Sequence, residues 1–193
     1  MRVGAAQRIM AVAGVCALAL IGLVVSEGNA RASGQEVLLA MEAVDPRALL
    51  GGHYVIVSPA QSLAPDEQCP PGGDWKWIAL RREGESHIVV GGGISREEAQ
   101  RIAPLVVRGS FECLDPTPPA DGAPGAPGWL RADVGIERFH INQAEAERID
   151  LILRDQRPGE AARAYAIISI GANGRARLRG LVVDGERLEL SWF

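Results

Sequence analysis

The chain has 193 residues, 47% of them hydrophobic, and a formal net charge of −4. This length accommodates a targeting segment and one domain of about 150 residues, which can form a core without a metal. The acidic balance disfavours a nucleic-acid partner or a polybasic lipid-surface module, because both usually carry net positive charge.

Residues 1–32 have the arrangement of an export signal. A charge-free apolar run of 17 residues begins at Ile9 and ends at Val25, and two arginines precede it. Arginines keep that end in the cytoplasm, so we expect 33–193 to form one β-rich domain in the periplasm. The length lies between that of a cleavable signal peptide and that of a membrane helix. We expect a retained single-pass anchor in the bacterial inner membrane, and the Ala30-Arg31-Ala32 site leaves cleavage as the alternative.

The first two expected strands, 35–44 and 53–58, are joined by a turn rich in special residues. A proline fixes the backbone after an aspartate that can accept hydrogen bonds from the amides that follow it, and a glycine permits a tight bend. We expect this segment to be a structured corner, with a binding site as the alternative. The candidate motif comprises Asp45, Pro46, Arg47, Gly52, His53 and Tyr54.

A proline-rich and glycine-rich loop at 65–74 carries Cys69, and Cys113 ends a later strand. Two cysteines in an oxidising compartment are expected to pair when the geometry allows it. We therefore expect a Cys69–Cys113 disulfide, with two separate thiols as the alternative. The third cysteine, Cys16, lies in the apolar run and is not expected to be a lipidation site, because Val15 precedes it.

The rest of the chain predicts further short strands and two short helices, about eight strands in all. Ser95 and Glu98 have capping-box spacing and Pro104 ends that helix; Asn142 begins the second helix and Pro158 ends it. The fold class is α+β and mainly β, with one small antiparallel sheet or barrel-like domain behind a transmembrane helix. The further strands are expected at 75–82, 86–90, 105–114, 129–141, 164–170, 175–183 and 186–190.

Three stretches, at 44–55, 135–139 and 179–185, resemble the GDYXXLXY proteins, a family of bacterial membrane-anchored proteins without an assigned activity. The first resembles the family pattern V-D-P-R-x-L-x-x-G-D-Y. His53 stands where the family has Asp, Val57 where it has Leu, and Pro59 where it has the second Tyr. The resemblance implies the membrane helix, the topology and the fold. It implies no mechanism, and the corner lacks the carboxylate of the family motif.

Side chains that could carry chemistry are scattered. The three histidines, His53, His87 and His140, have no metal-binding spacing, so we expect no metal and no cofactor. A Ser–Lys hydrolase would have to use Lys76, the single lysine, with Ser58 or Ser62. Lys76 is expected to point to solvent instead. Carboxylate pairs such as Glu83 and Glu85 lie in turns or at helix starts, which favours solvated roles over glycosidase chemistry.

Arg175, Arg177 and Arg179 alternate and therefore share one face of a strand. We expect a solvated face balanced by neighbouring acids, with an anion-binding surface as the alternative. Three functions follow from these observations. The first is a non-enzymatic anchored module that binds an integral-membrane partner or helps to assemble an envelope complex. The second is an anchored hydrolase of the Ser–Lys or carboxylate type, and the third is a periplasmic domain that binds a small ligand.

Overall fold

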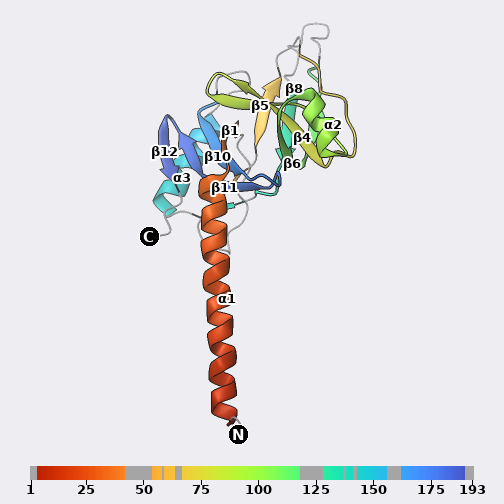
Figure 1. Cartoon of the computed structure of the whole chain (residues 1–193). Helices are drawn as coiled ribbons and strands as arrows, with labels where there is room; N and C mark the ends of the chain where they lie inside the picture. Colours follow the sequence, from red (N-terminus) through yellow and green to blue (C-terminus); the bar gives the residue numbers. More distant parts are fainter. Residues whose placement is uncertain are drawn as a thin grey trace.

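The computed structural model describes residues 4–41, 54–57, 59–63, 67–117, 128–136, 138–140, 143–155 and 162–189. A long N-terminal helix stands out from a domain built mainly of strands, with two further helices on that domain (Figure 1). The predicted class, mainly β behind an N-terminal apolar helix, is confirmed. The arrangement of the strands differs from the prediction in three respects, which concern one parallel pair, two divided strands and one additional strand.

The N-terminal helix, α1 (Ala5–Ser33), is long and apolar enough to cross a membrane, although a signal sequence has the same properties. Its large apolar side chains are exposed: Ile9 is 68% exposed and Val25 is 55% exposed. At a rise of 1.5 Å per residue, the run from Ile9 to Val25 is roughly 26 Å long, close to the thickness of a hydrocarbon core. The helix continues for eight residues beyond Val25, and Gly34 alone separates it from the first strand.

The main sheet has seven strands in the order β12-β11-β10-β1-β5-β4-β6. Its neighbours are antiparallel except β1 and β5, which run parallel and pair at Leu39 and His87. The sheet is therefore mixed: it is mainly antiparallel, as expected, with one parallel pair at its centre. The strands are β1 (Gln35–Ala40), β4 (Trp77–Glu83), β5 (Ser86–Gly93), β6 (Leu105–Arg108), β10 (Ala164–Ile170), β11 (Ala176–Val183) and β12 (Glu186–Glu189).

The described strands of the main sheet do not close into a barrel. The edge strand β6 reaches the turn between β10 and β11, where the Arg108 amide donates to the Gly174 carbonyl at 2.8 Å. The same turn is held by side chains: Arg108 Nε donates to the Asn173 carbonyl, and Arg96 Nη1 donates to the Ala172 carbonyl. This contact ties the two halves of the sheet together where a barrel would have ladder hydrogen bonds.

Two smaller sheets complete the described domain. One has the order β3-β8-β7, with β3 (Ala60–Leu63), β8 (Gly128–Asp133) and β7 (Ser110–Leu114). The other pairs β2 (Tyr54–Ile56) with β9 (Arg138–His140). Two predicted strands are thus divided, since 105–114 forms β6 and β7, and 129–141 forms β8 and β9. The first division occurs at Gly109, where a Cβ atom would collide with the Asp133 carbonyl.

The two short helices form where capping and apolar spacing predict them. In α2 (Arg96–Ile102), Ser95 Oγ accepts from the Glu98 amide at 3.2 Å, which confirms the capping box. The second helix, α3 (Gln143–Asp155), places Ile149 in the core, with no exposed surface. The main core lies between the seven-stranded sheet and the β3-β8-β7 sheet. It includes Val37, Leu39, Ile78, Leu80, Leu130, Ile168 and Leu181.

The Cys69–Cys113 disulfide is formed, with the two Cα atoms 5.8 Å apart. It fastens the segment before β4 to β7, and the Cys69 amide also donates to Asp115 Oδ1 at 2.8 Å. In the same segment Trp75 Nε1 donates to the Pro71 carbonyl, and its ring packs where Gly92 has no side chain. The predicted disulfide is confirmed, and Cys16 is a free thiol exposed on α1.

Candidate functional site

A polar region with several contacts between distant segments lies where α1 meets the main sheet. We call it the helix–sheet junction and define it by Glu27, Gly34, Glu36, Ser169 and Arg177. Glu36 on β1 is in register with Ser169 on β10, and Ser169 is in register with Arg177 on β11. Residues in register project from the same face of a sheet. The last turns of α1 therefore lie on a row of polar side chains.

An ion pair fastens α1 to this row. Arg177 Nε donates to Glu27 Oε1 at 2.8 Å, across 150 residues of sequence, and only 12% of the Arg177 side chain is exposed. Arg31, one helical turn beyond Glu27, brings its Nε to 3.6 Å from the same oxygen. Arg175 also acts electrostatically on this carboxylate. Helix and sheet are therefore joined by charge-assisted contacts, which are stronger than neutral hydrogen bonds.

Gly34, the residue that follows α1, occupies a space too small for a side chain. A Cβ atom on Gly34 would overlap Ser169 Oγ and approach the Ile170 carbonyl. Ser169 is completely buried, and its hydroxyl has no hydrogen-bond partner among the described residues. The end of α1 is thus in direct contact with β10, and Gly34 is the single residue between α1 and β1.

A second group of charges surrounds Glu36 at the outer side of the junction. Arg179 and Arg187 bind this carboxylate at 2.9 Å and 3.0 Å, and Arg187 also binds Glu189 at 2.8 Å. The hydrogen bond from Arg187 is the main reason that the pKa of Glu36 is lowered, and its two carboxylates raise the pKa of Arg187. In this group, the positive charges of two arginines balance the negative charges of two glutamates.

These contacts revise the interpretation of the alternating arginines. Arg177 and Arg179 do share a face and do meet acidic partners, but α1 covers Arg177, so the face is not simply solvated. Of the three arginines, only Arg175 is exposed. The sequence signal that was missed is Glu27, an isolated acid just after the apolar run, whose partner lies on β11.

A second candidate lies at the seam where β1 and β5 diverge after their pairing at His87. Gln61 of β3 fills the gap: the Val89 amide donates to Gln61 Oε1 at 2.8 Å, and Gln61 Nε2 donates to the Val89 carbonyl at 3.4 Å. Beside it is a cavity of about 10 Å³, lined by Leu39, Ala40, Pro59, Ala60, Gln61, His87, Val89, Leu130 and Ala132. Such a volume accommodates roughly one water molecule and no metabolite.

His87 gives this seam its only described titratable group. Its Nδ1 atom is buried and has no partner among the described residues. Burial, and then the positive charge of Arg82, lower the pKa of His87. A neutral imidazole beside one water-sized space is a structural feature of the seam, and no described nucleophile adjoins it.

The predicted motif corner falls almost wholly outside the described residues. Asp45, Pro46, Arg47, Gly52 and His53 lie outside the described residues, and Tyr54 is described only as the first residue of β2.

The two described residues of the Ser–Lys alternative, Lys76 and Ser62, belong to different parts of the fold. Lys76 is exposed just before β4, whereas Ser62 lies on β3 in a different sheet, and Ser58 is not described. Glu98 serves the α2 cap. Within the described ranges no three His, Cys, Asp or Glu side chains form a group that could hold a metal.

The family model of the GDYXXLXY protein matches residues 16–181. The chain belongs to the GDYXXLXY family. This confirms the resemblance, and the matched region includes both Glu27 and Arg177, so both sides of the junction lie within the family's extent. No curated protein and no solved structure matches this GDYXXLXY protein significantly.

Proposed function

We propose that this GDYXXLXY protein is a retained single-pass protein of the bacterial inner membrane. Its periplasmic domain is a non-enzymatic module that binds an integral-membrane protein or helps to assemble an envelope complex. The observation that carries the proposal is the helix–sheet junction. It makes α1 and the domain one structural unit, through the Glu27–Arg177 pair and the direct Gly34 connection.

The junction supports retention of the N-terminal segment over cleavage. Ala30, Arg31 and Ala32 all lie inside α1, and the first two are partly covered by the domain. A peptidase acting after Ala32 would have to unwind this turn from the sheet. It would also remove Glu27 and leave the largely buried Arg177 without this partner, which is unfavourable.

Two further observations support the compartment and orientation. The Cys69–Cys113 bond is typical of proteins in oxidising compartments such as the periplasm. The arginines that precede Ile9 favour a cytoplasmic N-terminus, which places the residues after Val25 on the other side of the membrane. Both observations agree with a domain that begins at the periplasmic surface of the bilayer.

The geometry favours binding through the surface over chemistry in a cleft. The seam cavity has room for about one water molecule. By contrast, large apolar side chains are exposed on α3 and just before α2: Leu151 on α3 is 68% exposed, and Ile94, two residues before α2, is 60% exposed. Exposed apolar groups beside charged surfaces are the kind of feature that protein partners contact.

The proposal is tested in cells with the complete chain. A photo-reactive amino acid is placed at Leu151 or Ile94, with exposed Glu85 on the β4–β5 hairpin as the matched control. An alkaline phosphatase fusion at the C-terminus reports the compartment. We expect an active fusion, a membrane-bound protein, and a reproducible crosslink to one integral-membrane protein from an apolar position only. An inactive fusion, or no crosslink above the Glu85 control, would contradict the proposal.

A further inference from the structure

We infer that the peptide bond between Ala32 and Ser33 is a processing site for an enzyme of the signal-peptidase type, and that the β10–β11 hairpin protects it. The hairpin comprises residues 164–183, far along the sequence from the bond. Retention of α1 then depends on completion of the domain, and a chain whose junction is open is cut and released from the membrane. This inference rests on the proposed function, because it explains how a chain with a cleavable motif keeps α1.

The sequence around this bond has two features that such a peptidase recognises. Small residues, Ala30 and Ala32, occupy the first and third positions of an A-x-A-like motif that ends at the bond. Ala32 lies seven residues beyond Val25, which is about 10 Å along the helix and near the surface of a bilayer that α1 crosses. Cleavage adds one water molecule across the amide, which leaves a carboxylate on Ala32 and a free α-amino group on Ser33.

In the folded protein this bond is exposed, but its backbone is helical. Ala32 and Ser33 both lie in α1, and Ser33 Oγ donates to the Asn29 carbonyl at 2.8 Å. Proteases cut chain that has opened locally, so cleavage requires the last turn of α1 to unwind. The rate of cleavage therefore follows the fraction of molecules in which this turn is open.

Contacts on both sides of the bond hold the turn in place, and both involve the hairpin. Before the bond, Arg177 on β11 binds Glu27 at 2.8 Å, and only 12% of the Arg177 side chain is exposed. After the bond, β1 pairs with β10 from Gln35 onward, where Gln35 is in register with Ile170. Between them, a Cβ atom on Gly34 would lie 3.0 Å from the Ile170 carbonyl oxygen. Unwinding must break the ion pair or pull β1 from β10, and neither contact exists until the hairpin has formed.

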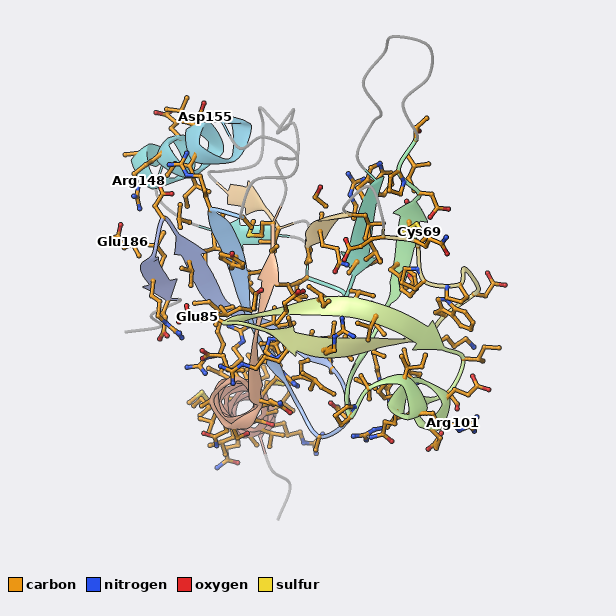
Figure 2. All side chains as sticks on the ribbon, turned by 90° about the horizontal axis from the view of Figure 1, so that it is seen from above. Cys69, Glu85, Arg101, Arg148, Asp155 and Glu186 are labelled. Carbon is orange, nitrogen blue, oxygen red and sulfur yellow. A yellow bond between two sulfur atoms is a disulfide. The ribbon has the colours of Figure 1, made fainter. Side chains whose placement is uncertain are left out.

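These contacts are confined to one part of the domain. Figure 1 shows that α1 joins the domain beneath β10 and β11. Figure 2, seen from above, shows α1 end-on, and it labels Cys69 and Arg101 well to one side of the helix. The disulfide joins Cys69 to the β3-β8-β7 sheet, which contains Leu130, and Arg101 lies on α2. Changes at Leu130 and Arg101 therefore leave the contacts of the junction itself in place.

The test uses the complete chain, purified in neutral detergent, and a purified bacterial signal peptidase. Mass spectrometry follows the appearance of a chain that begins at Ser33. We expect slow cleavage of the unmodified chain and about fivefold faster cleavage of Arg177→Ala, the factor that corresponds to the loss of a partly exposed ion pair. Arg177→Lys keeps the charge, so its rate should lie between the two. Adding Ala32→Phe to Arg177→Ala should abolish cleavage, because the motif needs a small residue there.

Two controls separate the junction from general effects. Arg101→Ala removes an exposed arginine elsewhere and should leave the rate of cleavage unchanged. Leu130→Ala weakens the core away from the junction, so it should lower the melting temperature. It should nevertheless raise the rate of cleavage less than Arg177→Ala does, because local opening does not require the whole domain to unfold.

Three outcomes would overturn the inference. They are no cleavage before Ser33 in any variant, equal rates for Arg177→Ala and Arg101→Ala, and a greater acceleration by Leu130→Ala than by Arg177→Ala. An unmodified chain that already begins at Ser33 when it is purified would contradict the proposed function as well. A full-length chain whose cleavage does not respond to Arg177 contradicts only this inference. Thermal melting of each variant before the peptidase is added confirms that the compared chains are folded.

Discussion

Removal of the Cys69–Cys113 disulfide is expected to destabilise the domain strongly without unfolding it. The suitable variant replaces both residues by alanine, since a single replacement would leave a reactive thiol. The bond closes a loop between residues 44 apart. Loop closure of that length restricts the unfolded chain by about 4 kcal/mol on the chain-entropy estimate. For a protein of this size, that corresponds to a fall in melting temperature of roughly 8–16 °C.

Tryptophan fluorescence is the natural assay, because the Trp75 ring packs beside Gly92 and Phe111 in the segment that the bond fastens. Thermal melts of the complete chain in detergent should show the fall in the double variant and a similar fall when reductant is added to the unmodified protein. Cys16→Ala is the matched control, since this thiol is exposed on α1. An unchanged melting temperature in the double variant would refute the reasoning, because it would mean that the unfolded state gains no freedom.

Three further predictions concern the junction, the seam and the core. Replacing either Glu27 or Arg177 by alanine should lower the free energy of unfolding by about 1 kcal/mol in urea titrations. The double-mutant coupling should be roughly 0.5–1 kcal/mol, a modest value because the Glu27 side chain is 41% exposed. A coupling energy of zero would contradict a stabilising Glu27–Arg177 ion pair. Because the pKa of His87 is lowered in the folded protein, the imidazole of the unfolded chain takes up its proton at a higher pH than the imidazole of the folded chain. The free energy of unfolding is therefore highest above pH 6.5, the pKa in the unfolded chain, and it falls as the pH drops below that value. His87→Gln should flatten that slope in pH-dependent melts, and an unaltered slope would assign it to other groups. In urea titrations, Leu130→Ala should lower the free energy of unfolding by about 3 kcal/mol, because Leu130 is buried in the core. Leu114→Ala should lower it by less than about 0.5 kcal/mol, because Leu114 is exposed. Equal losses would contradict the assignment of Leu130 to the core.

Local patterns in the sequence predicted much of the fold. The capping box at Ser95 and Glu98 and the break between the expected strands 175–183 and 186–190 depend on neighbours within a few residues, and both form. The cysteine pairing followed from the compartment implied by residues 1–32, and from the presence of only two cysteines in the domain. These features needed no knowledge of which strands lie side by side.

The remaining features depend on contacts between distant segments. Two such features are the parallel pairing of β1 with β5 and the Glu27–Arg177 ion pair. Each joins residues far apart in the sequence, so no periodic pattern of residues along the chain indicates it. The division at Gly109 follows from a close approach to Asp133, which is visible only once β8 is in place. The strand β3 was missed because Ala60, Gln61 and Ser62 have weak strand preference, and its pairing with β8 stabilises it.

The central claim is that α1 remains part of the mature protein and continues into the domain as one unit. The most direct measurement is the intact mass of the protein, carrying a C-terminal tag and purified from the membranes of the cells that make it. We expect the mass of the full 193-residue chain, which is 20.5 kDa before the tag is added. A mature protein that begins at Ser33 would contradict it, because Glu27 would then be absent and the junction could not exist.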